Sequence, residues 1–580
     1  MDQLKEVLEG TIDFEGQKLV ESLNFWIINI GTALSFLGLD LSTQQLKGLV
    51  VCEDLSPVCH VKVEFDVDLP GYKTQKGVYT NNSEHEVQAP VVMWLDALDL
   101  LFKRLKDKEV DLKQLKGISG ACQQHGSVFW NEKSSDKLAQ LNAGATLKDQ
   151  LEETFAWEMS PNWQDHSTAK ECKQFEEAVG GAEELARISG SKAHHRFTGP
   201  QVLKLKNRRP ELYEATSRIA LVSSFLASVL AGKHAVHDIG DVCGMNLWDI
   251  EKGQWNETLV GLLHDKLAKE RLGPVAADGK KSNCSIGNVS KYFVDKYGVN
   301  SECAVIPYTG DNPGTILSLP LEPNDVIVSL GTSTTALVVT ERYVPSSLYH
   351  LFAHPVSDGA YMGMLCYCNG ALAREQVRDA INAKYSVSDK SSWEKFNELT
   401  EKYSDVKDDT NDVKIGFYFP LSEIIPDAAP TLKRLTWSSD GSHVSEDTNN
   451  WEIPDEDALR ILESQALSIR YRLSPMLTTD GHRPRRIYYV GGASGNATIC
   501  TAMSRVLVPL DGAYTLDLSD ACATGAAYKA VYGVIDQGQS DWNAFIKAHW
   551  KGGRLVEGTQ GMEDRYQNSV NLFVESEKKL

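Results

Sequence analysis

The organisation of this chain follows from one stretch, Val326-Ile327-Val328-Ser329-Leu330-Gly331-Thr332-Ser333-Thr334-Thr335-Ala336-Leu337-Val338-Val339. Its two apolar halves are typical of β-strands, and the Gly-Thr-Ser-Thr turn between them predicts a hairpin. Such a turn presents backbone N–H groups and hydroxyls, which suit a phosphate group. We therefore expect Gly331, Thr332 and Ser333 to contact the phosphates of a nucleotide.

A second stretch of the same design, residues 36–51, lies near the N-terminus. It also has an apolar strand, a Ser/Thr-rich turn containing Thr43, and a return strand that closes on Leu-Val-Val. Two such hairpins suggest an internal duplication. Asp40 ends the first strand, where a carboxylate either orients Mg²⁺ near a transferring phosphate or bonds its own backbone as a turn residue. The matching hairpin favours the magnesium role, and places Thr43 near the nucleotide.

An acidic residue comes shortly before the 326–339 hairpin, in Tyr308-Thr309-Gly310-Asp311-Asn312-Pro313-Gly314. Small, turn-forming neighbours leave the Asp311 side chain free to point into a cleft. An acid beside a phosphate-binding hairpin suggests phosphoryl transfer to a hydroxyl, with Asp311 as the base. Because the transition state is loose, the base needs only to orient the hydroxyl and accept its proton late, so an ordinary pKa suffices.

A glycine-rich loop, Gly491-Gly492-Ala493-Ser494-Gly495-Asn496, follows a strand at 486–490 and precedes a helix. Small residues let a ligand approach the backbone closely, and a helix N-terminus adds a positive field. The alternative is a tight strand–helix turn without a ligand. The chain contains no Gly-x4-Gly-Lys-Ser/Thr motif, which excludes a P-loop kinase.

Three polar segments carry groups that suit sugar hydroxyls: 123–126, with Gln124 and His125; 160–168, with Trp163 and Asp165; and 194–199, with Arg196. Each has a structural alternative. A lone histidine is often a satisfied core or turn residue, the second segment is unspecific, and the third also fits a solvated surface cluster. No spacing of these histidines supports a zinc site.

Composition bounds the remaining possibilities. A chain of 580 residues is too long for one compact core, so two large domains are expected. The net charge of −20 argues against a nucleic-acid binder. An odd count of 11 scattered cysteines indicates reduced thiols in a cytoplasmic protein.

The local patterns place this chain in the α/β class, because strands alternate with helices. Helices are predicted over 91–106, 211–231 and 455–476, and residues 384–412 are expected to form a polar surface insert. An uncharged run at 24–39 is short for a membrane span, and the acidic residues before it do not fit a signal peptide. We interpret its end as a core strand and residues 1–33 as an extension, with no membrane role.

Taken together, these segments resemble a known family. Asp-Leu-Ser-Thr-Gln at 40–44, Gln-Gln-His-Gly at 123–126, Ser-Pro-Asn-Trp-Gln-Asp at 160–165, Arg-Phe-Thr-Gly at 196–199, Gly-Asp-Asn-Pro at 310–313, Gly-Thr-Ser at 331–333 and Gly-Gly-Ala-Ser-Gly-Asn at 491–496 occur in order. The set resembles the FGGY carbohydrate kinases, and within them the eukaryotic xylulose kinases, over residues 35–550.

The resemblance implies an actin/hexokinase/Hsp70-like (ribonuclease H-like) fold with the active site in the cleft between two domains. Residues 34–318 would form the N-terminal domain, with the sugar site and the base, and 319–550 the nucleotide-binding domain, followed by a tail at 551–580. It implies ATP-dependent phosphorylation of D-xylulose to D-xylulose 5-phosphate, with Mg²⁺, feeding the pentose phosphate pathway.

The resemblance also assigns residues. His125, Arg196, Asp311 and Asn312 are the expected sugar contacts, to which the local patterns add Gln124, Trp163 and Asp165. Gly492, Ala493 and Asn496 would hold the nucleotide together with Gly491, and Trp393 would lie near the adenine or ribose.

Alternatives stay open at this point. A kinase for another pentulose or polyol, such as ribulose or glycerol, keeps the fold and changes only the pocket. A non-catalytic sugar-binding regulator would not need Asp311, and an actin-like ATPase would not need the sugar-suited segments. We expect small-molecule partners only, and a monomer or homodimer.

Overall fold

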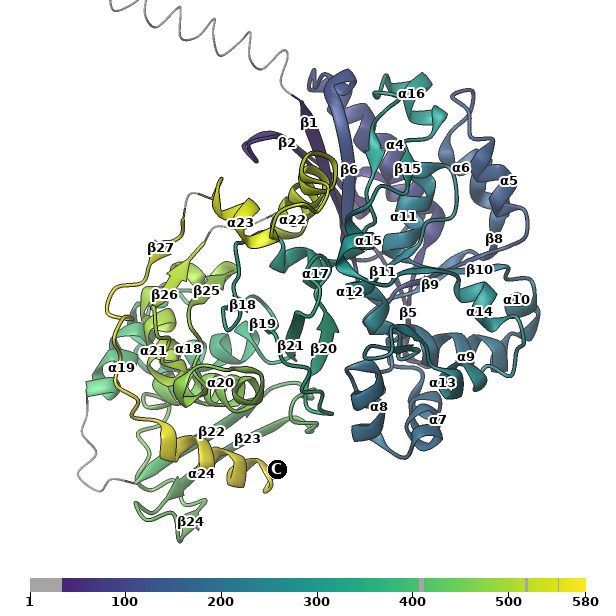
Figure 1. The fold of residues 1–580 in the computed structure, drawn as a ribbon. Helices are drawn as coiled ribbons and strands as arrows, with labels where there is room; N and C mark the ends of the chain where they lie inside the picture. The colour runs from purple at the N-terminus through teal and green to yellow at the C-terminus, as the bar shows by residue number, and fades with distance from the viewer. Residues whose placement is uncertain (1–33, 406–411, 517–519, 551) are drawn as a thin grey trace, which may run out of the picture.

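The computed structural model describes residues 34–405, 412–516, 520–550 and 552–580, so the extension at 1–33 lies outside the described residues. It has two domains, each built on a mixed β-sheet with helices packed around it (Figure 1). The α/β, two-domain class predicted from the sequence is confirmed.

The first sheet has the strand order β15-β16-β6-β1-β2-β3, with β17 also paired to β6. β1 and β2 form the antiparallel hairpin predicted at 36–51, and β6 joins β1 in parallel. The bounds are β1 (Ser35–Leu41), β2 (Gln45–Cys52), β3 (Pro57–Glu64), β6 (Leu115–Cys122), β15 (Gly287–Asn288), β16 (Ala304–Val305) and β17 (Thr309–Gly310).

The second sheet has the order β20-β21-β19-β18-β25-β26-β27. Its hairpin is β18–β19, antiparallel, and β25 joins β18 in parallel, as β6 joins β1. This shared arrangement supports the duplication inferred from the two hairpins. The bounds are β18 (Val326–Leu330), β19 (Thr334–Thr340), β20 (His350–Ala353), β21 (Tyr361–Tyr367), β25 (Ile487–Val490), β26 (Ala513–Thr515) and β27 (Arg554–Leu555).

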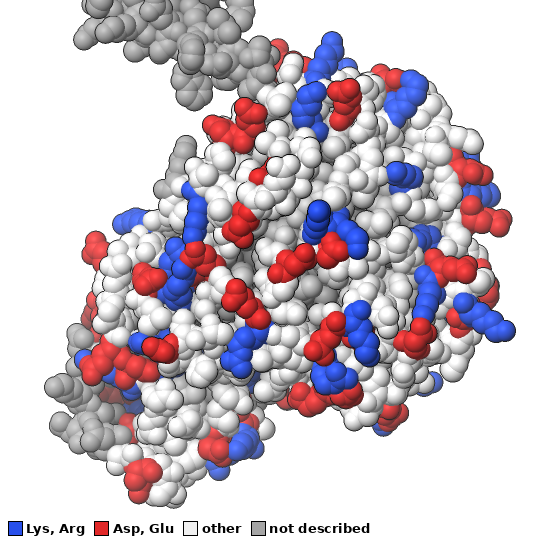
Figure 2. Space-filling view, viewed as in Figure 1, with Lys and Arg blue, Asp and Glu red and all other residues white. Residues whose placement is uncertain are grey.

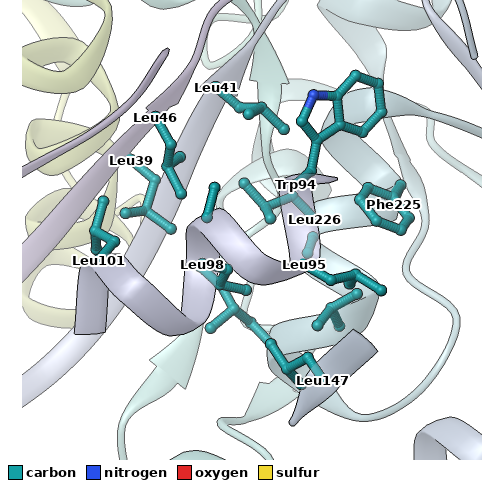
Figure 3. Close-up of a cluster of buried hydrophobic side chains, with 14 of the residues drawn as sticks. Leu39, Leu41, Leu46, Trp94, Leu95, Leu98, Leu101, Leu147, Phe225 and Leu226 are labelled. Carbon is teal, nitrogen blue, oxygen red and sulfur yellow. The ribbon is translucent and has the colours of Figure 1, made fainter. Parts of the chain in front are cut away.

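The core of the first domain forms where helix α4 (Val91–Asp107) covers the first sheet, as the helical spacing at 91–106 predicted. In Figure 3, Leu98 and Leu101 of α4 lie near Leu39 and Leu46 of the hairpin, and Trp94 lies near Phe225 of α11 (Val222–Ala231). Each of these side chains is fully buried or nearly so. Burying one large apolar side chain contributes roughly 1.5–3 kcal/mol, so this layer fixes the strands that present the site.

One predicted helix is wrong. Residues 211–231 are not a single helix but α10 (Pro210–Glu214), β10 (Arg218–Leu221) and α11, which ends at Gly232. β10 pairs antiparallel with β7 (Ser127–Trp130). A short apolar run fits a buried strand as well as a helix, and the pairing with β7 decided between them. The helix predicted at 455–476 is confirmed as α20 (Asp457–Leu473).

The surface insert predicted at 384–412 is also partly wrong. It contains helix α19 (Glu394–Asp405), and Phe396, Leu399 and Tyr403 of that helix are buried in the core of the second domain. The apolar residues are few, so the polar composition concealed an amphipathic helix. Residues 406–411 lie outside the described residues.

A helix from the end of the chain packs on the first sheet. Helix α22 (Ala521–Val531) falls within the predicted second domain, yet it approaches Gly38 of β1 so closely that a Cβ there would come within 2.0 Å of the Ala523 carbonyl oxygen. Gly525 makes a similar close approach, since its Cβ would meet the Gly314 carbonyl oxygen at 1.9 Å. Gly314 belongs to α17 (Asp311–Ile316), so α22 lies against the helix that carries the predicted base.

Residues 552–580, within the stretch predicted as a tail (551–580), contribute to the second domain. β27 pairs with β26, and α24 (Gln567–Glu577) buries Phe573 and pairs its Glu577 with Arg472 at 3.0 Å. None of the described helices combines the length and apolar character that crossing a bilayer requires. All eleven cysteines are free thiols.

Charged residues of both signs alternate over the face shown in Figure 2, without a broad patch of Lys and Arg.

Candidate active site

Asp311 is the first residue of α17, a helix that lies where the two domains meet (Figure 1). It directly follows β17, whose Gly310 is the partner of Cys122 at the end of β6. Its Oδ1 accepts hydrogen bonds from the backbone N–H of Asn312 at 2.8 Å and from Asn312 Nδ2 at 3.0 Å. Burial raises the pKa of Asp311 to about 7, against the opposing effect of the Asn312 N–H, and the charge of Asp40 adds to the rise.

Gln124 joins this group from the other side. It follows β6, and its Oε1 accepts a second hydrogen bond from Asn312 Nδ2 at 3.0 Å. The Asn312 amide therefore bridges Asp311 and Gln124. The structure brings together three of the residues predicted as sugar contacts.

Asp40 lies on the opposite side of β6 from Asp311, because Leu41 of β1 and Gly310 of β17 are both partners of Cys122. Asp40 is buried, and its Oδ1 accepts from Ser42 Oγ at 2.8 Å. Burial raises the pKa of Asp40, and the Lys47 ammonium, 3.8 Å from Oδ2, partly offsets this rise. Two buried carboxylates thus lie on either side of the end of β6.

His125 also follows β6, in a left-handed backbone conformation with φ of 72°. Its Nδ1 lies 3.1 Å from the Gly244 carbonyl oxygen, which can only accept, so Nδ1 carries the proton. Burial lowers the pKa of His125 well below its ordinary value, and the ring stacks on Phe197 with 4.4 Å between centroids. The ring is therefore neutral and leaves Nε2 as an acceptor for a hydroxyl.

Arg196 is held by the second domain. Its Nη2 donates to Nε2 of His350 on β20 at 3.0 Å, and Nδ1 of His350 lies 2.9 Å from Ser191 Oγ. Burial lowers the pKa of Arg196. No sequence pattern indicated His350, because its contact with Arg196 joins residues of different domains.

The two remaining residues predicted as sugar contacts are Trp163 and Asp165, and they have different surroundings. Trp163 is 43% exposed, and its Nε1 donates to Thr43 Oγ1 at 2.8 Å. A predicted sugar contact and a predicted nucleotide contact thus lie together. Both oxygens of Asp165 accept hydrogen bonds from the protein, from Val87 N at 3.1 Å and from Gln201 Nε2 at 2.8 Å, so these bonds fix its side chain, and its role as a sugar contact stays a prediction.

The two predicted nucleotide loops are adjacent. Gly491 has a φ of 87°, and a Cβ there would lie 3.2 Å from the Leu330 carbonyl carbon, which directly precedes Gly331. A Cβ at Gly492 would meet nothing within 4 Å, so this side of the loop is open. Thr332 and Ser333 complete the hairpin turn beside it.

Asn496 closes the glycine loop, which contains Ala493 within the turn η7 (Gly492–Gly495). Its side chain caps α21 (Ala497–Leu507) by accepting from Ile499 N at 3.2 Å, and its Nδ2 donates to Asn397 Oδ1 at 2.9 Å. Asn397 is another residue that the sequence did not indicate, since it lies in the unexpected helix α19.

Trp393 lies one helical turn before Asn397, whose backbone N–H donates to the Trp393 carbonyl at 2.9 Å. The Arg378 guanidinium lies 4.8 Å from the centre of its ring, and Phe396 packs edge-on at 5.2 Å. Trp393 is therefore near the glycine loop but already has aromatic and cationic neighbours.

No group of three or more His, Cys, Asp or Glu side chains encloses a metal position within the part of the chain that the structure describes. Mg²⁺ in phosphoryl-transfer sites is commonly held by one or two carboxylates and by substrate phosphates. Asp40 fits such a partial ligand set.

Known proteins decide the family. The chain is 45% identical to "Probable D-xylulose kinase A" of Aspergillus fumigatus, covering 94% of this chain and 97% of that protein. It is 44% identical to "D-xylulose kinase A" of Aspergillus niger, covering 93% and 97%. The models of the FGGY family of carbohydrate kinases match residues 159–318 (N-terminal domain) and 326–534 (C-terminal domain). The chain belongs to the FGGY family of carbohydrate kinases.

Solved structures agree with the fold of this FGGY kinase. Xylulose kinase from Rhodospirillum rubrum superimposes with a TM-score of 0.73 at 16% identity, covering 94% of this chain and 98% of that one. Plasmodium falciparum glycerol kinase with ADP gives 0.68 at 16% identity, covering 94% and 98%. At this identity the likeness concerns the fold alone.

Proposed function

We propose that this carbohydrate kinase transfers the γ-phosphoryl group of ATP to a hydroxyl of D-xylulose, giving D-xylulose 5-phosphate and ADP. The fungal relatives named as D-xylulose kinases support the substrate, because they match nearly the whole chain. One observation carries the mechanism: Asp311, with a pKa of about 7, opens a helix where the two domains meet.

Asp311 acts as the general base. The sugar hydroxyl oxygen attacks the γ-phosphorus, the bond to the β–γ bridging oxygen breaks, and the hydroxyl proton passes to the Asp311 carboxylate. Because the transition state is loose, the transfer of this proton is late. The Asn312 amide holds Asp311 in place through its hydrogen bonds to Asp311 and Gln124.

The sugar would be bound by groups of complementary hydrogen-bonding character. Nε2 of neutral His125 accepts from a sugar hydroxyl, and the Arg196 guanidinium donates to sugar oxygens. Because His350 of the second domain holds Arg196, this contact also ties sugar binding to the relative position of the domains.

The nucleotide phosphates would lie against the turn Gly331–Thr332–Ser333 and the loop 491–496. Backbone N–H groups there suit phosphate oxygens, and the start of α21 adds a positive field. Asp40 would hold Mg²⁺, which when bound neutralises phosphate charge. Positioning and preorganised electrostatics then supply most of the rate.

A cytoplasmic location and a monomeric or homodimeric state belong to the same proposal. The eleven free thiols suit a reducing compartment. The chemistry described uses the sugar, ATP and Mg²⁺.

A coupled assay of ADP formation with D-xylulose, D-ribulose, glycerol and no sugar tests the function. We expect D-xylulose to give the highest kcat/KM and ADP formation without sugar to be negligible. Equal activity with glycerol or ribulose would overturn the substrate, and sugar-independent hydrolysis would overturn the kinase mechanism.

A further inference from the structure

Six lysine and arginine side chains are buried among the described residues, and five of them have a carboxylate partner. The partners are Glu86 for Lys204, Asp265 for Arg271, Asp564 for Arg470, Glu577 for Arg472 and Asp238 for Lys529. Arg374 is the exception: within the described ranges no carboxylate lies in salt-bridge distance of it. An unpaired buried charge is costly, so its presence calls for an explanation.

Arg374 lies in the first turn of α18 (Ala371–Lys384) and is fully buried. Its Nη1 donates to Gln465 Oε1 at 2.8 Å and approaches Thr334 Oγ1 at 3.5 Å. Its Nε and Nη2 have no hydrogen-bond partner in the described structure. Burial lowers the pKa of Arg374 to about 10, so the guanidinium stays charged at neutral pH.

The position of this charge relates it to the nucleotide loops. Thr334 directly follows the turn Gly331–Thr332–Ser333, and the N–H of Ala371, at the start of the same helix, donates to the carbonyls of Gly331 and Thr332, each at 3.1 Å. Burial raises the pKa of the Cys500 thiol, in the first turn of α21, and the charge of the nearby Arg374 guanidinium partly opposes this rise. The guanidinium therefore lies behind both loops.

We propose that Arg374 is a positioning residue for the nucleotide. The negative charge of the β- and γ-phosphates compensates the buried positive charge of Arg374, which has no carboxylate partner among the described residues. This positive charge acts on the phosphates electrostatically across the hairpin, without touching the ligand. A unit charge roughly 8 Å from a phosphate at an effective dielectric constant of about 20 changes affinity about tenfold or more. The inference rests on the proposed nucleotide site at 331–333 and 491–496.

The test compares Arg374→Met with the parent, using isothermal titration with ADP and with adenosine. We expect about tenfold weaker ADP binding and unchanged adenosine binding, because only ADP carries the phosphates. Arg374→Lys should retain most of the ADP affinity. The ligand-free Arg374→Met protein should melt at or above the parent temperature, because an uncompensated buried charge has been removed.

Arg472→Met is the matched control, since it also removes a buried guanidinium but leaves Glu577 unpaired. It should lower the melting temperature and leave ADP affinity unchanged. ADP affinity within twofold of the parent in Arg374→Met, or an equal loss for adenosine, would overturn the inference. If Arg374→Met does not fold, the same ADP and adenosine comparison on Arg374→Gln and Arg374→Lys decides.

Gly492→Val separates this inference from the proposed nucleotide site. A Cβ at Gly492 would meet nothing within 4 Å in the protein, so we expect the variant to fold, and it should weaken ADP binding if the loop holds the nucleotide. Unchanged ADP affinity in Gly492→Val would mean that the site itself is misplaced. Loss in Gly492→Val with no loss in Arg374→Met would reject only the role of Arg374.

Discussion

Lys529 of α22 donates a hydrogen bond of 2.7 Å to Asp238, and both side chains are fully buried. Asp238 Oδ1 also accepts from Thr309 Oγ1 at 2.7 Å, two residues before Asp311. Asp238 further caps helix α12 (Ile239–Val242) by accepting from Gly240 N at 2.9 Å. One buried ion pair thus joins a helix from the end of the chain to the strand that presents the base.

Lys529→Met should lower the free energy of unfolding by about 3–5 kcal/mol, because it leaves Asp238 buried and unpaired. Adding Asp238→Asn removes that charge, so the double variant should recover much of the loss. Urea denaturation measures both. If the free energy of unfolding of Lys529→Met lies within about 1 kcal/mol of the parent value, solvent reaches the Asp238 carboxylate and offsets the loss of its partner.

Asp311→Asn should lower kcat by roughly 10²–10⁴-fold, the usual scale for loss of a general base. The amide keeps the size of the side chain, so the dissociation constant for D-xylulose should change little. Single-turnover kinetics with an independent sugar-binding measurement separates the two effects. Turnover within a few-fold of the parent would refute the assignment of the base.

The pKa of Asp311, about 7, predicts a pH profile. Since the base must be ionised, kcat/KM of the parent should decrease below about pH 7, with a slope that approaches a tenfold loss per pH unit. The residual activity of Asp311→Asn should not show this decrease. The parent rate staying flat down to pH 5 would contradict it.

The ionisation of Asp311 should also make the stability of the fold depend on pH. Stability should fall as the pH rises, whereas activity should rise. The folded carboxyl holds its proton up to about pH 7, whereas its ordinary pKa is 3.8, so stabilisation present at low pH is lost as pH rises through that window. Asp311→Asn removes this dependence, so its melting temperature relative to the parent should rise from pH 5 to pH 8. A constant difference would mean that the carboxyl group is not desolvated.

His125→Ala should raise the KM for the sugar more than the KM for ATP, because the Nε2 acceptor faces the sugar side of the proposed site. His237 offers a matched control, as another buried imidazole, hydrogen-bonded to the Leu272 carbonyl at 2.8 Å. His237→Phe should leave the ratio of the two KM values unchanged. Equal increases in both constants for His125→Ala would argue against a sugar contact.

The elements that sequence could predict are those whose signals are local. The hairpins at 36–51 and 326–339, the turn before Asp311 and the loop at 491–496 each combine a strand pattern with turn-forming residues in a few consecutive positions. Their grouping in space followed from the resemblance to the FGGY kinases.

What sequence could not predict depends on distant partners. His350 and Asn397 have no motif, because each acquires its role from a residue in another element, Arg196 and Asn496. The apolar run that forms β10 fits a helix as well as a strand, and only its pairing with β7 distinguishes the two. The approach of α22 to β1 likewise depends on the absence of a side chain at Gly38, which is not informative by itself.

The place of α22 has a consequence for biosynthesis. Phe36 of β1 is buried in a cluster with Ala523 and Ala527 of that helix. When the ribosome has completed the first sheet, the residues that cover this side of it have not yet been translated. An N-terminal domain usually folds while the rest of the chain is still being synthesised. Here the first domain cannot complete its packing until α22 has been synthesised. Nascent chains should keep this apolar surface available to chaperones until translation passes residue 531.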